Sequence, residues 1–455
     1  MRRTSRQTLS SPRFTVLEIA FLERDVRLRM PFRFGIVTLT ESPQAFVRAR
    51  IRLENGVEAE GAAAELLAPK WFDKDPALTN EQNFEQLRES LRSACRDYLA
   101  HGADTAWGHF RAGYRPGLVA AYGPAMLDRA LLDALCRALG IPFYEAVRRN
   151  AIGAADFEGM AMPEFLAGLR PGGPLAARHT VGLVDPIVAG DLKARVGDGL
   201  PETLEEVLAA YGQRYFKLKV GGEPEADLER LSSIAAVLDR IDAPYFASLD
   251  GNEQYEDMAG VAELWRRMQA DRRLARMVES IIFIEQPVKR SHALDARVEG
   301  IDKPVIIDES DDSLDAFPRA RALGYLGVSS KTCKGLYKSL INRARCALWG
   351  PQYLMSGEDL TIQAGLALQQ DLALVSLLGL THVERNGHHY VNGMASLPPG
   401  EQEDFLAAHP DLYERSHGAV RVKIRDGRLA IASLGCPGFA SAASPDWNSM
   451  KEMKP

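Results

Sequence analysis

The sequence predicts an α/β protein, in which a (β/α)8 TIM-like barrel follows an N-terminal α+β domain. Two observations predict the barrel. From about His179 onward, eight short apolar runs alternate with helical stretches over roughly 200 residues, which is typical of parallel βα units. A doubly wound open sheet is the alternative, but the Gly-rich phosphate loop that usually follows its first strand is missing from the sequence.

The predicted barrel occupies residues 179–390. Its strands read, in chain order, HTVGLVD, YFKLKV, PYFASLD, SIIFIEQP, PVIIDES, YLGVSSK, QYLMSGED and GLTHVERNG. Helices are predicted between most of them, at Pro224–Arg240, Tyr255–Gln269, Leu314–Ala322, Gly335–Leu348 and Thr361–Leu377.

The N-terminal domain is predicted over residues 1–150. Segments 14–30 and 44–65 alternate apolar and polar residues, with a hairpin turn at residues 54–56. Residues 31–43, PFRFGIVTLTESP, contain Gly and Pro and are predicted to form a loop. Amphipathic helices follow at 80–102 and from 123, the second ending at Gly140. Residues 150–178 are predicted to be a loop insertion, and residues 391–455 to pack back on the first domain.

Composition places the chain among ordinary globular proteins. It has 455 residues, of which 46% are hydrophobic and 25% charged. The net charge of −6 argues against a nucleic-acid partner, and no run of 18 apolar residues predicts a membrane span. Five cysteines without CxxC spacing fit a reducing compartment. We therefore expect a cytoplasmic protein with neither a nucleic-acid nor a membrane partner.

Three successive predicted strands end in an acid. These acids are Asp250, Glu285 and Asp308. A single acid after a buried strand is usually a helix cap or part of a salt bridge, but three at neighbouring strand ends come within reach of one centre. An all-oxygen ligand set is what Mg²⁺ prefers. Glu309 should point away and support the ligands from behind, although an exchange of roles between Asp308 and Glu309 stays open.

Lysines end two other predicted strands. Alternation places Phe216, Leu218 and Val220 on one face of the second strand, and Lys217 and Lys219 on the other, toward the barrel. Lys331 ends the sixth strand, half a barrel turn away, so Lys219 and Lys331 should face each other across the mouth. Lysines act as bases when burial and positive neighbours lower their pKa. Lys334 is the rival of Lys331, but is expected to begin the next helix.

Together these motifs resemble the enolase superfamily. The segments KLK, SLD, IEQP and DES and the later lysine are similar to those of its muconate-lactonizing subgroup, within the mandelate racemase/muconate lactonizing enzyme family. The resemblance covers nearly the whole chain. It implies that residues 1–150 are a capping domain, that the substrate-specificity loop lies near residues 31–43, and that the protein is a homo-oligomer.

The resemblance also implies a reaction. A base removes the proton α to a carboxylate, and one Mg²⁺ stabilises the resulting enolate. Matched by position, Asp250, Glu285 and Asp308 would bind the metal. Lys219 and Lys331 would be the acid/base pair, while Lys217 would support the substrate carboxylate and tune Lys219.

Some residues depart from known patterns in the superfamily. Members like mandelate racemase use a histidine after the seventh strand, whereas this chain reads LMSGEDL there. The eighth strand continues as VERNGHHY in place of the Asp-x-Asp typical of dipeptide epimerases. Specificity is therefore expected from a separate set of residues, some of which could instead be ordinary loop residues: Arg33, Phe34, Glu358, Glu384, His388 and His389.

The substrate is expected to be a small-molecule carboxylate, and four functions are compared for this set of residues. Lysines on both faces favour an isomerase that is a racemase or epimerase, because one lysine can remove the proton and the other can return it. A cycloisomerase or a dehydratase resembling o-succinylbenzoate synthase is the alternative on the same scaffold. A Schiff-base aldolase or a non-catalytic metal-binding protein fits less well, because neither explains both the acids and the paired lysines.

Overall fold

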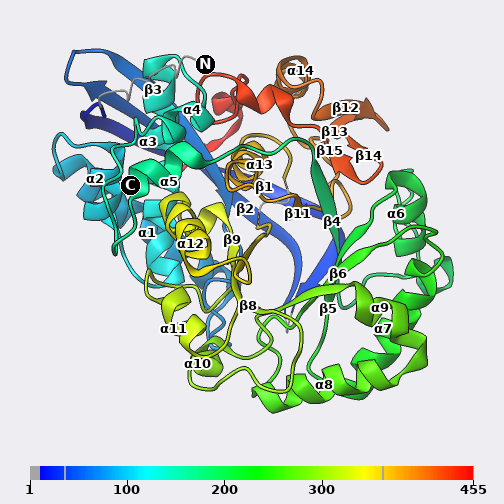
Figure 1. Ribbon diagram of the computed structural model, residues 1–455. Helices are drawn as coiled ribbons and strands as arrows, with labels where there is room; N and C mark the ends of the chain where they lie inside the picture. The colour runs from blue at the N-terminus through cyan, green and yellow to red at the C-terminus, as the bar shows by residue number, and fades with distance from the viewer. Residues whose placement is uncertain (1–10, 35–36, 361–362, 454–455) are drawn as a thin grey trace, which may run out of the picture.

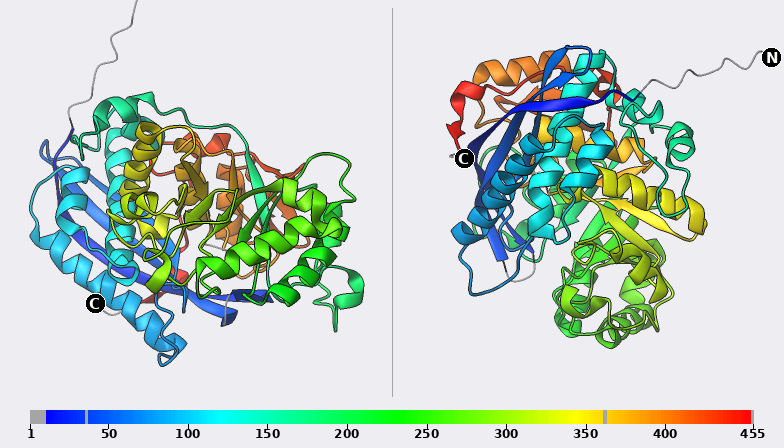
Figure 2. Two further views of the ribbon diagram at one scale, coloured as in Figure 1. Left: turned by 60° about the horizontal axis from the view of Figure 1, so that its bottom comes forward. Right: turned by 90° about the vertical axis from the view of Figure 1, so that its left-hand side faces the viewer.

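The computed structural model describes residues 11–34, 37–360 and 363–453. Two large sheets organise it, an antiparallel sheet at the N-terminus and a closed parallel barrel (Figure 1). Figure 2 shows the N-terminal strands and their helices gathered on one side of the barrel.

The N-terminal sheet has the strand order β16-β1-β2-β3. Its strands are β1 (Phe14–Phe34), β2 (Val37–Leu53), β3 (Glu58–Leu66) and β16 (Lys451–Glu452). The β2–β3 turn lies where the sequence predicts it, and Gly56 adopts φ +87° there. Through β16, the end of the chain adds an edge strand to β1.

The prediction of a loop at residues 31–43 is wrong for the described residues. β1 and β2 remain paired as far as Phe34 and Val37, so this segment is the end of a long hairpin. Apolar and polar residues alternate on both of its sides, and a register irregularity between Arg27 and Phe32 accommodates Pro31. Residues 35 and 36 at the tip lie outside the described residues.

Helices cover this sheet. α3 packs against β3 and α1, and it ends at Leu139 because Gly140 takes the left-handed conformation (φ 64°). Thr79 begins α1 with a capping box. The helices of this region are α1 (Asn80–Ala100), α2 (Ala106–Gly113), α3 (Leu118–Leu139), α4 (Phe143–Arg148) and α5 (Met162–Gly168).

Asp128 of α3 gives this region a testable pH dependence. It is buried and accepts a hydrogen bond from Tyr98 Oη (2.8 Å), and burial raises its pKa from the usual 3.8 to about 8. The contribution of Asp128 to stability is therefore complete below about pH 4, and it is lost by about 1.4 kcal/mol per pH unit as the pH rises to about 8. Asp128→Asn should remove this slope and stabilise the protein at pH 8, as urea unfolding at pH 5 and 8 can measure. An unchanged slope would contradict the assignment.

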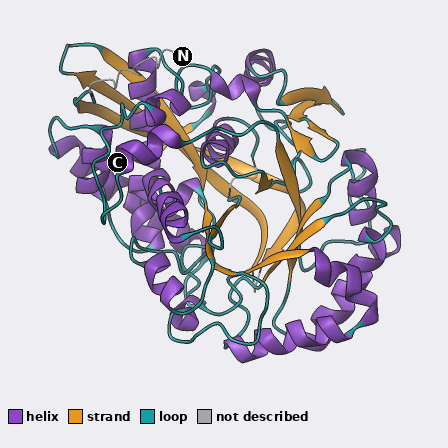
Figure 3. Ribbon diagram, viewed as in Figure 1, coloured by secondary structure: helices purple, strands orange, loops and turns teal. Residues whose placement is uncertain are grey.

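The predicted barrel is confirmed. Eight parallel strands pair in chain order, and β11 pairs with β4 to close the ring. Figure 3 shows the strands around the centre and helices outside them. The barrel strands are β4 (Leu175–Val181), β5 (Tyr215–Lys219), β6 (Phe246–Asp250), β7 (Ile281–Glu285), β8 (Val305–Ile307), β9 (Gly327–Ser330), β10 (Leu354–Gly357) and β11 (His382–Glu384).

The first barrel strand begins at Leu175 rather than at His179. Residues 150–178 therefore are not a loop throughout, since they contain α5 and the start of β4. The loop is predicted because residues 150–178 are rich in Gly, Pro and Ala. In the structure, Arg178 is buried and its charge is paired with Glu358.

Helices and short C-terminal strands surround the barrel. The helix predicted at 361–377 begins at Leu366, and residues 361–362 lie outside the described residues. The helices are α6 (Leu204–Tyr211), α7 (Pro224–Leu238), α8 (Met258–Ala270), α9 (Ala275–Ser280), α10 (Arg290–Ala293), α11 (Ala316–Ala322), α12 (Leu336–Trp349), α13 (Leu366–Leu377) and α14 (Pro399–Ala408). The remaining strands are β12 (Tyr413–Ser416), β13 (Ala419–Val422), β14 (Ile424–Arg425) and β15 (Arg428–Leu429). None of the described helices combines the length and apolar character needed to cross a membrane.

Candidate active site

The three predicted acids stand at the carboxyl ends of consecutive barrel strands. Asp250 ends β6 and Glu285 ends β7, and the two are direct neighbours in the parallel register. Asp308 follows β8 immediately. Each is buried, with at most 1% of its surface exposed. Burying three carboxylates together is costly unless cations or hydrogen bonds compensate their charge.

Lys217 supplies much of that compensation. Its side chain points into the barrel, as the alternation along β5 predicts. Its ammonium lies close to four carboxylate oxygens, from Asp250 (2.9 Å), Glu285 (2.9 Å), Glu358 (2.6 Å) and Glu384 (3.1 Å). Burial alone would lower the pKa of Lys217, but these carboxylates hold it well above its usual range. Lys217 is therefore a fixed positive charge in this arrangement.

Glu285 is left only partly compensated. Despite the nearby ammonium, neither of its carboxylate oxygens makes a hydrogen bond within the described residues. Burial raises its pKa well above the usual range, and the negative charges of Glu358, Asp250 and Asp308 raise it further. The carboxylates around Glu285 therefore create a negative potential that disfavours its ionised form, and a further cation there would be stabilising.

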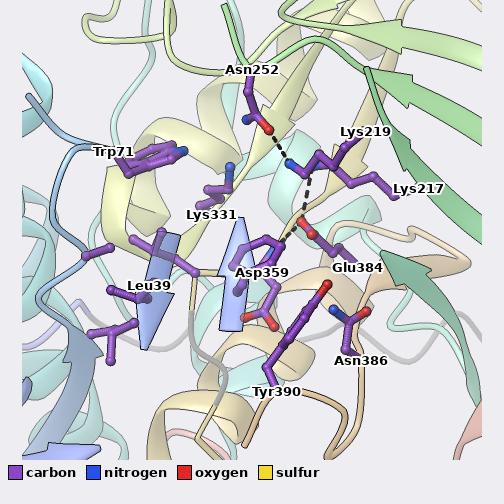
Figure 4. Close-up of a pocket in the computed structure, with 14 residues that line it drawn as sticks. Leu39, Trp71, Lys217, Lys219, Asn252, Lys331, Asp359, Glu384, Asn386 and Tyr390 are labelled. Atoms are coloured by element: carbon purple, nitrogen blue, oxygen red, sulfur yellow. Dashed lines mark hydrogen bonds and ion pairs between the residues drawn. The ribbon is translucent and has the colours of Figure 1, made fainter. Parts of the chain in front are cut away.

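Lys219 and Lys331 enter one pocket from different strands (Figure 4). Lys219 Nζ lies 2.6 Å from Asp250 Oδ2 and also contacts Asn252. Lys331, directly after β9, pairs with Asp308. An aromatic ring of the N-terminal region stands beside each ammonium, Phe32 at 6.0 Å from Lys219 and Trp71 at 4.5 Å from Lys331.

The charge of Lys331 depends on its acidic neighbour. Burial would lower its pKa, but Asp308 more than offsets this and raises it above the usual range. In this arrangement Asp308 therefore holds Lys331 in its charged form. The pKa of Asp308 is correspondingly held well below its usual range, because the lysine charges outweigh the effect of burial.

Lys334 lies closer to the acids than expected. It ends a 3-10 turn (Thr332–Lys334) just before α12. Its Nζ lies 2.8 Å from Ser329 Oγ, 3.1 Å from Asp311 and 3.3 Å from Asp308 Oδ1. It does not line the pocket, so it neutralises these acids from behind.

The residues fit a cation in chemistry but not in their present spacing. Asp250, Glu285 and Asp308 offer only oxygen atoms as ligands, and the oxygens of Glu285 accept no hydrogen bond within the described residues. Yet across residues 11–34, 37–360 and 363–453, no three His, Cys, Asp or Glu side chains are grouped closely enough to hold a metal ion. Lysine ammoniums lie against these acids, so a metal would have to displace Lys217 from Asp250 and Glu285.

The pocket between the lysines is small, about 50 Å³. Its lining residues are Phe32, Leu39, Leu66, Ala68, Trp71, Lys217, Lys219, Asn252, Lys331, Asp359, Leu360, Glu384, Asn386 and Tyr390. Much of this lining is apolar, and the polar groups lie on the barrel side.

The predicted specificity residues fall in different places. Glu384 lines the pocket, whereas Glu358 lies behind it between Arg178 and Lys217. Arg33 is exposed and outside the lining, so the structure gives it no contact there. The side chain of Phe34 lies outside the described residues. His388, His389 and Glu309 are buried outside the lining, and Glu309 Oε1 lies 3.3 Å from Asn252 Nδ2 and from Lys74 Nζ.

Comparison with known proteins agrees with this geometry. Residues 199–441, more than half of the chain, match the family described as enolase C-terminal domain-like. The chain belongs to the enolase superfamily. No curated protein matches the chain significantly.

Solved structures of superfamily members share the fold. The muconate lactonizing enzyme of Pseudomonas fluorescens, in complex with muconolactone, has a TM-score of 0.61 and 19% identity over 95% of this chain and 97% of that one. The L-Ala-D/L-Glu epimerase of Bacillus subtilis has a TM-score of 0.59 and 16% identity over 94% and 99%. A Bradyrhizobium enolase complexed with magnesium and mandelic acid has a TM-score of 0.59 and 16% identity over 95% of this chain and 96% of that one. At these identities, the likeness establishes the fold alone.

Several lining residues of this enolase-superfamily chain were not predicted. Asn252 follows Asp250 by two residues, so the same strand-end argument could have found it. Asp359 follows Glu358 and was within the region expected to set specificity. Trp71 lies outside every predicted motif, and Tyr390 is the last residue of VERNGHHY but was not singled out; tertiary packing brings both to the lysines.

Proposed function

We propose that this protein is an Mg²⁺-dependent enzyme that removes the proton α to a carboxylate, and that it is a racemase or epimerase. One observation carries the proposal. Lys219 and Lys331 come from the second and sixth of eight barrel strands and enter the same pocket, with buried carboxylates at the strand ends between them. Paired amine groups on two sides of a bound carbon are what exchange of configuration needs.

The side chains divide the work. Lys219 and Lys331 would move the proton at the α-carbon, and Lys217 would orient the substrate carboxylate near the acids. Asp250, Glu285 and Asp308 would hold Mg²⁺. When bound, the metal would supply positive charge to the negative charge that develops on the carboxylate.

Electrostatics supports the need for a cation. Asp308 raises the pKa of Lys331, which disfavours the neutral amine that a base requires, and Glu285 accepts no hydrogen bond within the described residues although Lys217 lies 2.9 Å away. A divalent cation shared by these carboxylates would weaken their hold on the lysines and place a positive charge near them. Both effects lower a lysine pKa toward the value that a base requires.

The test is α-deuterium exchange in D₂O. With Mg²⁺ and a panel of chiral carboxylates, we expect loss of the α-proton signal from both enantiomers of a substrate, together with racemisation. Proton NMR follows the first and chiral chromatography the second. If no carboxylate in a broad panel loses its α-proton, the proposed function is wrong.

A second candidate rests on the charge state of Lys331. If Asp308 keeps Lys331 protonated during turnover, only Lys219 is a base, and the site suits cycloisomerisation or elimination of water. Exchange would then be limited to one enantiomer, and mass spectrometry would detect a lactone or a dehydrated product.

A further inference from the structure

The pocket wall after β11 presents an unusual hydrogen-bonding pair. Asn386 and Tyr390 both line the pocket, and Figure 4 shows the Tyr390 hydroxyl beside the Asn386 amide. Their existing hydrogen bonds determine what each can still offer to a ligand.

Toward a ligand, the hydroxyl group of Tyr390 can act only as a hydrogen-bond acceptor. Its hydroxyl donates its proton to Asp185 Oδ2 at 2.6 Å, and the ring packs against Phe32 with centroids 4.4 Å apart. The Gly182 backbone N–H also donates to Asp185 Oδ2, at 2.8 Å. Burial favours the neutral acid, but contacts with His389 and Tyr390 outweigh it and lower the pKa of Asp185. The phenolic proton is thus committed to a carboxylate, and an oxygen lone pair remains.

Asn386 can offer a donor. Its Oδ1 accepts a hydrogen bond from the Thr180 backbone N–H at 2.6 Å, which fixes the orientation of the amide. The amide nitrogen is therefore turned to the side of Tyr390 (Figure 4). One donor and one acceptor stand next to each other on this wall.

The other polar groups nearby already have partners. Glu384 accepts from Thr180 Oγ1 (2.5 Å) through Oε1, and from Lys217 (3.1 Å) and the Asp359 N–H (3.2 Å) through Oε2. The Asp359 carboxylate lies 2.8 Å from Arg385. The lining also includes apolar side chains, among them Leu39, Leu66 and Leu360.

We propose that the substrate carries a hydroxyl group on its side chain, which donates to Tyr390 and accepts from Asn386. The proposal rests on the proposed function, since it names the class of carboxylate for that site as a hydroxycarboxylate. A hydroxyl satisfies both residues with one oxygen. A second carboxylate in this position would be repelled by the lone pair of Tyr390 and by the negative charge of Glu384. An ammonium group has no acceptor, so it would leave the Asn386 N–H group without a hydrogen bond.

Equilibrium binding tests this without requiring turnover. The probes are short hydroxycarboxylates of increasing chain length, such as 3-hydroxybutyrate, each with a methyl-for-hydroxyl partner (3-methylbutyrate) and an amino partner (3-aminobutyrate). Calorimetry with Mg²⁺ present would measure each Kd. The wild-type protein should bind at least one hydroxylated acid more tightly than both of its partners, by about tenfold to a hundredfold.

Two variants locate the preference. Tyr390→Phe removes the acceptor and keeps the ring, and Asn386→Asp keeps the acceptor for Thr180 but replaces the donor. Each should reduce the preference for the hydroxyl to about threefold or less. Tyr245→Phe is the matched control, because Tyr245 also donates to an aspartate, Asp239 (2.9 Å), but lies just before β6, away from the pocket. It should keep the full preference.

The outcomes separate this inference from the proposed function. The inference is supported if the wild-type protein prefers a hydroxylated acid and both variants lose this preference. If, in addition, no acid exchanges its α-proton, only the proposed function fails. The inference is overturned if no hydroxylated acid is preferred, if the preference survives in Tyr390→Phe, or if the amino partner binds best.

Discussion

Replacing Lys219 with alanine is expected to stop α-proton exchange from one enantiomer of the substrate, and replacing Lys331 should stop exchange from the other. Each lysine points into the pocket from its own strand, and each has its own acid partner, Asp250 or Asp308. Loss of a positioned acid/base group costs about 10²- to 10⁴-fold in rate. Each variant should retain exchange on the opposite face, while racemisation falls in both.

The control for these variants is Lys193→Ala, which removes an exposed lysine outside the pocket. It should leave exchange and racemisation unchanged. If both single active-site variants still exchanged both enantiomers at the wild-type rate, the roles given to the lysines would be wrong. If Lys331→Ala kept exchange and lost only product formation, the reaction with a single base would be favoured.

Glu285→Gln should have opposite effects on stability and on activity. In metal-free buffer the variant should be more stable by about 1–3 kcal/mol, because it removes a buried carboxylate without hydrogen bonds. The pKa of Glu285 is raised in the folded protein, so its contribution to stability is complete below the unfolded pKa and is lost as pH rises. The gain should therefore be larger at pH 8 than at pH 5.

Activity should respond in the other direction. Removing one metal ligand is expected to lower exchange by about a thousandfold or more, and to abolish the rise in Tm that Mg²⁺ gives the wild-type protein. Glu60→Gln, at an exposed position on β3, is the control and should keep both the exchange rate and the rise in Tm with Mg²⁺. If Mg²⁺ raised the Tm of Glu285→Gln as much as that of the wild-type protein, Glu285 would not be a ligand. If the metal-free stability of the variant equalled that of the wild-type protein, the negative potential inferred around Glu285 would be contradicted.

The barrel could be predicted because its signals are local. Each βα unit has a short apolar run and a separate amphipathic helix, and the strand ends carry the acids and lysines. The alternation that faces Lys217 and Lys219 inward is a property of five consecutive residues of β5. Such features need no knowledge of distant contacts.

The errors arise where distant contacts decide. The start of β4 lies in a segment rich in Gly, Pro and Ala, which favours a loop, and the sequence does not show that Glu358 neutralises the buried Arg178 of this strand. The hairpin was expected to be a loop with Arg33 at the substrate, yet its neighbour Phe32 faces the pocket and Arg33 is exposed. Adjacent residues of a strand point to opposite faces, so an error of one residue reverses the assignment.

The same reasoning applies to the metal site and to the residues that were missed. Acids at neighbouring strand ends were foreseen, but their pairing with Lys217, Lys331 and Lys334 depends on side-chain positions that spacing does not reveal. Trp71 and Tyr390 come from segments before and after the barrel strands. Their approach to the lysines depends on how these segments pack.

The most direct test of the central claim is α-proton exchange in D₂O, followed by proton NMR over an Mg²⁺ titration. Wild-type protein is compared with the Lys219→Ala/Lys331→Ala double variant on the same panel of carboxylates. We predict exchange that requires Mg²⁺ in the wild-type protein, and none above background in the double variant. Exchange that survives loss of both lysines, or that is equally fast after exhaustive removal of divalent cations, would contradict the account.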